Sequence, residues 1–172
     1  MLNAKVKDLL NQQVNKEFYS AYLYLDFSNY FETRGLDGFA NWYKIQAQEE
    51  RDHAMLFYQY LHNNNEVVTL DAIGKPDKAL DSDMAVLQAG LEHEIYVTSL
   101  INDIYAAAHD AKDYRTMKFL DWFIEEQMEE EDTADTMVTR MKLFGSDAKA
   151  LYDLDQECAS RTYATPSPLA NA

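Results

Sequence analysis

The sequence predicts an all-α fold, a four-helix bundle with one long crossover connection and a short fifth C-terminal helix. Its 172 residues include only five glycines and three prolines, where average usage would supply about 20 of these turn-forming residues. Apolar side chains recur at the helical period through four long segments. The length corresponds to one domain. We assign residues 1–160 to that domain and residues 161–172 to a flexible C-terminal tail.

Two long helices are expected in the first part of the chain. The first covers about residues 4–33 and ends before Gly35, a residue type that favours a helix end. The second covers about residues 38–64, and Asp37 can cap its beginning. The inward face of the first helix carries Val6, Leu10, Val14, Ala21 and Tyr24. The inward face of the second carries Phe39, Trp42, Gln46, His53, Phe57 and Tyr60.

Residues 65–80 show no helical period and contain Gly74 and Pro76, so they are expected to form the crossover. Their only strand-like patch is Val67 and Val68.

The second part of the chain predicts two more long helices and a short one. The third helix begins at Asp81 or Ser82, and Asp113 can cap the fourth, which ends at Gly145. A fifth helix covers about residues 147–160. The inward face of the third carries Met84, Leu87, Leu91, Thr98, Ile101, Tyr105 and Ala108. The inward face of the fourth carries Met117, Leu120, Phe123, Ala134, Met137 and Met141.

The lengths of helices and links determine the expected architecture. A helix of nearly 30 residues is roughly 40 Å long. The links at residues 34–37 and 111–113 are short, so each pair of helices forms an antiparallel hairpin. The long link at residues 65–80 can run the length of the bundle, which gives a bundle with one crossover.

Composition excludes several classes of function. A net charge of −15 repels nucleic acid and anionic membranes and attracts cations. No apolar run approaches the ~20 residues of a membrane span, and the N-terminus has no apolar signal segment. The single cysteine, Cys158, excludes an intrachain disulfide and a four-cysteine metal site. It agrees with a reducing compartment, so we expect a cytoplasmic protein with no nucleic-acid or membrane partner.

Polar residues interrupt all four apolar faces at mid-length. They are Glu17 on the first helix, Glu50 and His53 on the second, Glu94 on the third, and Gln127 and Glu130 on the fourth. A carboxylate among core residues is costly unless it is paired or bound to a metal. One such residue could be a misassigned face, but an interruption on every helix indicates a common site.

The interruptions repeat with one spacing. The same separation along the chain relates Glu17 to Glu94, Glu50 to Gln127, and His53 to Glu130. Each half of the chain therefore supplies one carboxylate and then, after a turn, a pair at positions i and i+3. Such a pair lies on one helix face, so both side chains can reach one point.

The types of donor select the metal. Four carboxylates, one imidazole and one amide suit Fe(II), Mn(II) or Zn(II) and offer no soft sulfur for Cu(I). Bundle proteins that hold two iron or manganese ions use a Glu from each of two helices and Glu-x-x-His from the other two. The first half matches this pattern. The second has Gln127 and Glu130 instead, so we expect one of two metal positions to bind more weakly.

Other residues near this set have two interpretations each. His53 alone would more often be an ordinary histidine, and only the joint register favours a ligand. Tyr24 lies one heptad after Glu17 and is either core packing or a redox or hydrogen-bonding group. The acidic residues after position 124 form either a solvated face or an accessory cation site. Glu126 and Glu129 share a helix side, and the separation that relates Glu50 to Gln127 also relates Glu49 to Glu126.

Three sequence runs resemble those of bacterial non-haem ferritins: Gln48–Ala54, Asn15–Tyr19, and Trp122–Gln127 with the glutamates that follow. The resemblance covers about residues 1–160 and implies a ferritin-like bundle. It implies that the first iron is held by Glu17, Glu50 and His53, with Glu50 as the bridge. It implies that the second is held by Glu94 and Glu130, with Gln127 hydrogen-bonding at that side. The residues that match the family's third iron position are Glu49, Glu126 and Glu129.

The resemblance also implies a function. Fe(II) would be oxidised to Fe(III) by O2 or H2O2 and stored as ferric oxyhydroxide inside a closed cage of about 24 subunits. Bacterioferritins carry a haem-ligating methionine where this chain has Arg51, so no haem is expected. A di-iron oxidase or peroxidase without storage, and a structural cage with a vestigial site, are the alternatives. Iron entry through Asp110, Asp113 or Asp121, or directly through the bundle, stays open.

Assembly is expected from apolar residues that lie off the inward faces. They are Tyr22, Leu25 and Tyr30 on the first helix, and Val67, Val68 and Leu70 in the crossover. Their burial against neighbouring subunits would explain them.

Overall fold

The computed structural model of the chain describes residues 2–170, and within them every regular element is a helix. The four long helices are α1 (Ala4–Arg34), α2 (Asp37–Asn63), α3 (Asp83–Asp110) and α4 (Tyr114–Phe144). Two shorter helices follow, α5 (Ala148–Ala159) and α6 (Ser167–Ala170). The predicted all-α class is therefore confirmed, and the strand-like patch in the crossover does not form a strand.

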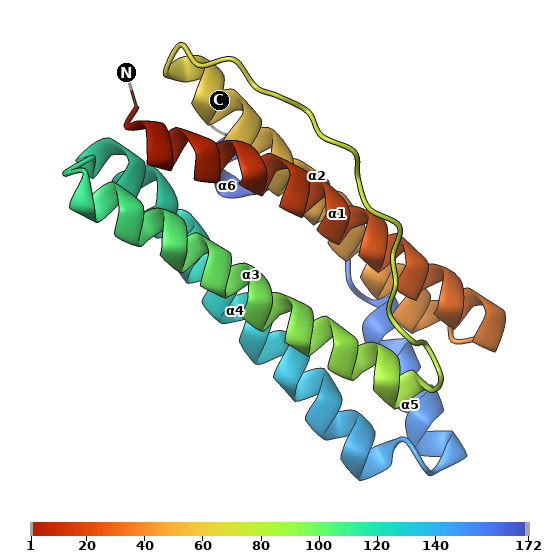
Figure 1. Ribbon diagram of the computed structural model, residues 1–172. Coiled ribbons are helices and arrows are strands. Elements are labelled where there is room, and N and C mark those ends of the chain that lie inside the picture. The colour runs from red at the N-terminus through yellow and green to blue at the C-terminus, as the bar shows by residue number, and fades with distance from the viewer. Residues whose placement is uncertain (1, 171–172) are drawn as a thin grey trace.

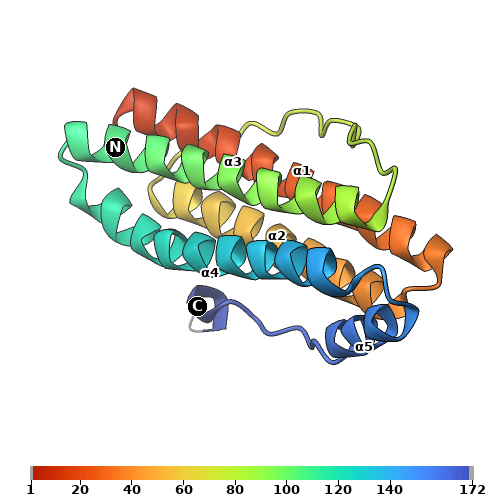
Figure 2. The ribbon, with the colours of Figure 1, turned by 90° about the horizontal axis from the view of Figure 1, so that it is seen from below.

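The long helices pack as two antiparallel hairpins. α1 pairs with α2 and α3 pairs with α4, and these are the most extensive contacts between elements (Figure 1). The crossover between α2 and α3 runs along the length of the bundle. Figure 2 shows α5 at the end of the bundle where α4 ends, with the chain returning beside the bundle to α6. Among the described helices, none is long and apolar enough to cross a membrane.

Side chains close the helix ends largely as predicted. Gly35 ends α1 in the left-handed region, with a φ of 71°. The side chain of Ser82 accepts a hydrogen bond at the start of α3, and that of Asp113 does so at the start of α4. The prediction that Asp37 caps α2 is wrong, because Leu36 occupies the cap position. The helix begins at Asp37 itself, one residue earlier than predicted, so Asp37 lies in the first turn, where its charge favours the helix dipole.

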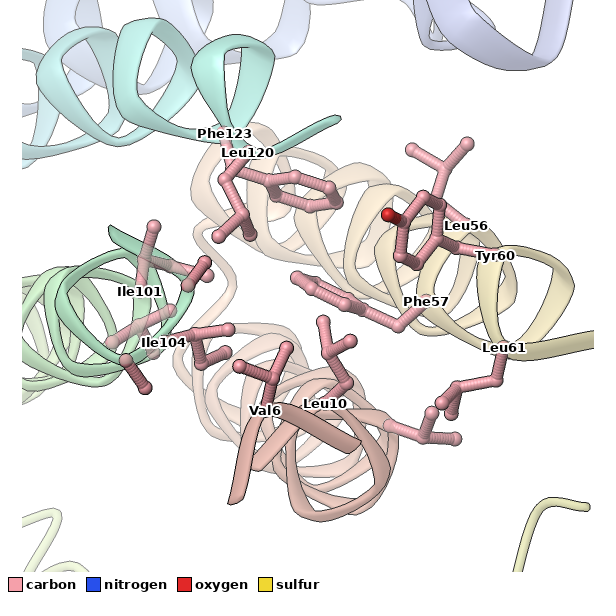
Figure 3. Packing of buried hydrophobic residues seen from close by; sticks show 14 residues of the cluster. Val6, Leu10, Leu56, Phe57, Tyr60, Leu61, Ile101, Ile104, Leu120 and Phe123 are labelled. Atoms are coloured by element: carbon pink, nitrogen blue, oxygen red, sulfur yellow. The ribbon is translucent and has the colours of Figure 1, made fainter. Parts of the chain in front are cut away.

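The core is divided into two apolar clusters, one toward each end of the bundle. One contains Leu10, Phe57 and Leu120 (Figure 3). The other contains Phe31 and Leu87. The predicted polar positions lie on the helices between these clusters, so both ends of the bundle hold them in place.

The segment after α5 contacts α2. The hydroxyl of Tyr163 donates to Asp52 Oδ2 at 2.6 Å, and Leu169 packs against the first apolar cluster. Residues 171–172 of the predicted tail lie outside the described residues, and its flexibility stays a prediction.

Candidate metal centre

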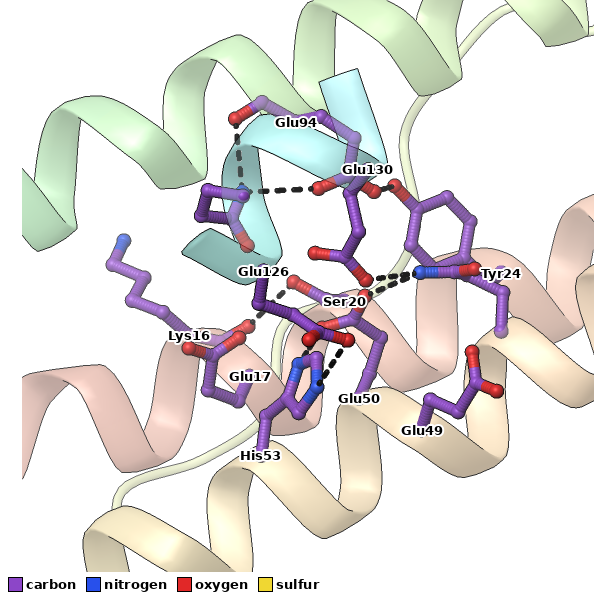
Figure 4. Close-up of polar contacts among 12 residues, drawn as sticks. Lys16, Glu17, Ser20, Tyr24, Glu49, Glu50, His53, Glu94, Glu126 and Glu130 are labelled. Atoms are coloured by element: carbon purple, nitrogen blue, oxygen red, sulfur yellow. Dashed lines mark hydrogen bonds and ion pairs between the residues drawn. The ribbon is translucent and has the colours of Figure 1, made fainter. Parts of the chain in front are cut away.

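The polar interruptions of the four helices meet in the middle of the bundle. Glu17, Glu50, His53 and Glu94 are each at most 4% exposed. Figure 4 shows their side chains converging from α1, α2 and α3, with Glu130 reaching the same place from α4. The sequence-predicted positions are therefore brought together in one buried polar site.

Three sets of ligand atoms in this site are close enough to hold a cation. Within each set the atoms lie within 4.8 Å of one another. The sets are Glu17, Glu50 and His53; Glu50, Glu94 and Glu130; and His53, Glu126 and Glu130. Glu50, His53 and Glu130 each belong to two of these sets. Glu50 is the carboxylate shared by the set with Glu17 and the set with Glu94, as a carboxylate that bridges two ions at these positions must be.

Two glutamines that the sequence analysis did not assign to the site support its carboxylates. Gln13 Nε2 donates to Glu17 Oε1 at 2.9 Å. Gln46 Nε2 donates to Glu50 Oε1 at 3.0 Å and to Glu130 Oε1 at 2.6 Å. Each glutamine lies one helical turn before its glutamate, so the two glutamines are separated by the same stretch of chain as the two glutamates. That repeated spacing is the signal by which the sequence could have identified them.

Tyr24 and Gln127 both contact Glu94. The Tyr24 hydroxyl donates to Glu94 Oε1, and Gln127 Nε2 lies 3.3 Å from Glu94 Oε2. The Tyr24 ring is 1% exposed and stacks on Tyr43 with centroids 5.6 Å apart. Tyr24 therefore combines the two interpretations, core packing and hydrogen bonding to a predicted ligand.

Three buried side-chain atoms in the described residues lack a hydrogen-bond partner, and all belong to this site: Glu17 Oε2, His53 Nε2 and Glu130 Oε2. Buried polar atoms without partners are rare because each costs about 1–3 kcal/mol. One or two divalent cations among them would supply the missing partners. The donor set of carboxylates and imidazole suits Fe(II) or Zn(II).

The pKa values show the cost of this arrangement without metal. Burial, together with the charge of Glu50, raises the pKa of Glu17 to about 8 and that of Glu94 to about 8. The pKa of Glu130 is also raised well above its ordinary value, by burial and by the charges of Glu94 and Glu50. Clustered carboxylates in a buried site resist ionisation in this way, and a cation reverses the effect.

His53 and Glu50 form the charged pair of the site. His53 Nδ1 lies 3.4 Å from Glu50 Oε2. Burial lowers the pKa of His53, but its contact with Glu50 and the charges of Glu50 and Glu17 outweigh this and raise it to about 9. Burial would raise the pKa of Glu50, yet the contact with His53 and the Gln46 hydrogen bond lower it.

A profile of the ferritin-like domain matches residues 7–144, which is most of the chain and all four long helices. The chain belongs to the ferritin family. It is 36% identical to a bacterial non-heme ferritin of Staphylococcus saprophyticus, over 95% of this chain and 98% of that protein. It is 37% identical to the bacterial non-heme ferritin of Campylobacter jejuni, over 91% of this chain and 93% of that protein.

Solved ferritins share the fold at higher identity. An open-pore ferritin of Archaeoglobus fulgidus superposes with a TM-score of 0.91 at 40% identity, over 94% of this chain and all of that one. A closed form of the A. fulgidus ferritin, engineered by mutagenesis, gives a TM-score of 0.92 at 40% identity. It covers 95% of this chain.

The outer carboxylates of this ferritin are not equivalent. Glu126 Oε1 lies 4.0 Å from His53 Nε2, so Glu126 borders the buried group although its own side chain is 31% exposed. Glu129 is exposed and lines the cavity beside the site. Glu49 lies to one side of the cluster in Figure 4 and forms an ion pair with Arg161, at 2.5 Å between Glu49 Oε2 and Arg161 Nη2. The three residues predicted for a third iron line one cavity, but one of them already has a cationic partner.

Proposed function

We propose that this chain is an iron-storage subunit with ferroxidase activity. It oxidises Fe(II) to Fe(III) with O2 or H2O2 at a dinuclear centre inside the bundle and stores the product as ferric oxyhydroxide. Glu17, Glu50 and His53 bind the first iron, Glu94 and Glu130 bind the second, and Glu50 bridges them. The single observation that carries this proposal is the set of unpartnered buried atoms at the point where the four helices meet.

The proposed chemistry uses two irons because reduction of O2 to H2O2, or of H2O2 to water, takes two electrons and two protons while each Fe(II) supplies one electron. The protein holds the two ions at a fixed separation and balances their charge as it grows. Glu17 and Glu94 carry pKa values of about 8 without metal, so binding of Fe(II) displaces protons from them at neutral pH. Family membership supports iron as the substrate.

We also propose that the subunits form a closed cage of about 24 copies. Exposed apolar side chains support association: Tyr22 and Leu25 on α1 are 52% and 48% exposed, and Val67 and Leu70 in the crossover are 78% and 68% exposed. Tyr30 and Val68 are partly buried within the chain, so they offer less surface for association than the other four residues. Tyr30 donates to Asp83 within the chain, and Val68 packs against the core.

The test is aerobic titration of metal-free protein with Fe(II), followed by sizing of the loaded particle. We expect fast oxidation of about two Fe(II) per chain, then slower uptake into a particle of several hundred kilodaltons. Fast oxidation by a monomer or dimer that holds no mineral would instead indicate an oxidase without storage. A particle that neither binds nor oxidises Fe(II) would indicate a structural cage.

A further inference from the structure

The cavity beside the proposed dinuclear centre carries an excess of negative charge. Its volume is about 400 Å³. Five carboxylates line it, those of Glu49, Glu94, Glu126, Glu129 and Glu130. Within the described residues, the only cationic side chain in its wall is that of Arg161. The arginine comes from the segment after α5, which also supplies Ala164, Thr165 and Pro166 to the same wall.

Arg161 is held in this position by contacts of both terminal nitrogens and of the face of its guanidinium group. Nη2 lies 2.5 Å from Glu49 Oε2, and the two side chains are only 20% and 17% exposed. Nη1 donates to Gln46 Oε1 at 2.9 Å and to the backbone oxygen of Trp42 at 3.2 Å. The guanidinium carbon lies 4.2 Å from the centre of the Trp42 indole ring. Asn41 fixes the backbone by donating to the Arg161 carbonyl.

These contacts have a direct consequence for cation binding at Glu49. A guanidinium keeps its proton at any physiological pH and has no lone pair to offer a metal. A cation can therefore use Glu49 only in two ways: it binds Oε1 against the repulsion of the adjacent Arg161 charge, or it displaces Arg161 from Oε2. Displacement would cost Arg161 a partly buried ion pair, two hydrogen bonds and a ring contact at the same time.

The same arginine also orients a residue of the dinuclear centre. Because Gln46 Oε1 accepts from Arg161, its amide nitrogen faces the opposite way, toward Glu50 and Glu130. Arg161 thus acts through Gln46 on a carboxylate proposed for each iron. Arg161 therefore both positions Gln46 and competes with a cation for Glu49.

We propose that Arg161 occupies the place of a third cation beside the dinuclear centre and sets the number of ions each subunit holds at two. This rests on the proposed function for the identity of the two-ion centre. The new claim is that the positive charge of Arg161 stands beside Glu49 where a third metal ion would bind, so the third position binds ions weakly in this chain. Removal of that charge should strengthen binding of the third ion.

Calorimetric titration of metal-free protein with Zn(II), which cannot be oxidised, tests the proposal. The decisive variant is Arg161→Gln. The matched control is Arg140→Gln, because Arg140 forms an exposed pair with Glu157 at 2.6 Å, away from the cavity. We expect the third Zn(II) to bind at least about tenfold tighter to Arg161→Gln than to the unmodified protein, which is about 1.4 kcal/mol. The control should match the unmodified protein.

Glu49→Gln completes the test and does not depend on the folding of Arg161→Gln. In the unmodified protein it should change the third ion's affinity by less than about twofold, because Glu49 is already paired. In the Arg161→Gln background it should abolish the gain. Equal isotherms for Arg161→Gln and the unmodified protein would overturn the proposal. So would a tenfold loss from Glu49→Gln alone, since Glu49 would then be a ligand. Failure to bind the first two ions would refute the proposed function separately.

Discussion

Replacement of Glu17 by glutamine should make the metal-free protein more stable while it weakens metal binding. Glu17 is 1% exposed and its pKa is raised to about 8 from an ordinary value of 4.5. At pH 7 the unfolded chain carries an ionised carboxylate and the folded chain carries a protonated one. Folding at pH 7 therefore requires protonation of a group whose ordinary pKa lies about 2.5 units below the pH, and each unit costs about 1.4 kcal/mol.

Protonation of Glu17 thus lowers the free energy of unfolding at pH 7 by about 3 kcal/mol, and a neutral side chain of the same shape avoids this loss. Glutamine fits the site, because its oxygen can still accept from Gln13 and its amide nitrogen can face Glu50 in place of the unpartnered Oε2. An imperfect hydrogen bond at that nitrogen would reduce the gain by about 1 kcal/mol. We expect Glu17→Gln to be about 2–3 kcal/mol more stable at pH 7 and nearly equal to the unmodified protein at pH 4.

Denaturant unfolding of the metal-free protein in a chelator, at pH 4, 5.5 and 7, measures this difference. Glu32→Gln is the control, since Glu32 lies on the same helix and is exposed. Its effect should stay within about 0.5 kcal/mol at every pH. The reasoning is refuted if Glu17→Gln gives no stabilisation at pH 7, or if its advantage is the same at pH 4. In either case burial of the ionisable carboxyl is not the source of the effect.

Three further predictions concern the same site. Loss of a residue that merely supports a metal ligand lowers metal affinity by about 10- to 100-fold. Because His53 is proposed to be a ligand itself, His53→Ala should lower Zn(II) affinity at the first position by at least that factor. Retention of two full-affinity ions in calorimetry would remove His53 from the ligand set. Tyr24→Phe should raise the pKa of Glu94 further, because the hydroxyl's hydrogen bond lowers it. Second-ion binding should then need a higher pH, and identical Zn(II) isotherms at pH 6 and 8 would contradict this. The metal-free protein should lose stability between about pH 5 and 9, because Glu17, Glu94 and His53 all have folded pKa values raised above their ordinary ones. Their stabilising protons leave as the pH rises, so melting temperatures should fall over that range without metal and change little with saturating Zn(II).

Much of the fold and most of the inner site could be predicted because both depend on local periodicity. Each long helix carries an apolar face at the helical period, and the polar interruptions stand out against it. The repeated spacing then relates interruptions that lie far apart in the chain, such as Glu17 and Glu94. Periodicity carries no information on irregular segments, which is why the contact between Arg161 and Glu49, 112 residues apart, was not predicted.

Errors at the level of single residues have similar causes. The cap at Asp37 was misassigned because the helix begins one residue earlier, with the apolar Leu36 at the cap position and Asp37 as its first residue. The hydrogen bond from Tyr30 to Asp83 was not predicted, because Asp83 lies across the crossover and only the folded bundle brings the two residues together. In both cases the residue type was read correctly, and the geometry of the connection decided its role.

The two halves of the bundle support their carboxylates in different ways, although their ligands share one spacing. In the first half, Gln13 and Gln46 each lie one turn before a glutamate and donate to it. The equivalent positions of the second half, one turn before Glu94 and Gln127, are Gly90 and Phe123, which have no side-chain donor. The second half therefore lacks donors one turn before its ligands; among the described residues of this half, Glu94 is reached only by Gln127 of α4 at 3.3 Å, and an unpartnered carboxylate there would be costly.

Further donors come from the first half, across the interface between the hairpins. Glu94 on α3 receives the hydroxyl of Tyr24 from α1, and Glu130 on α4 receives the amide of Gln46 from α2. Each hydrogen bond forms only when the two hairpins are packed in register, because a slip of one helical turn, about 5 Å, would carry both donors out of reach. Completion of the two-ion centre therefore depends on docking of the hairpins: the set Glu17, Glu50 and His53 lies on the first hairpin alone, whereas the set Glu50, Glu94 and Glu130 needs both. A cation at the second set stabilises the docked bundle through linkage, since neither hairpin alone offers all three of its ligands.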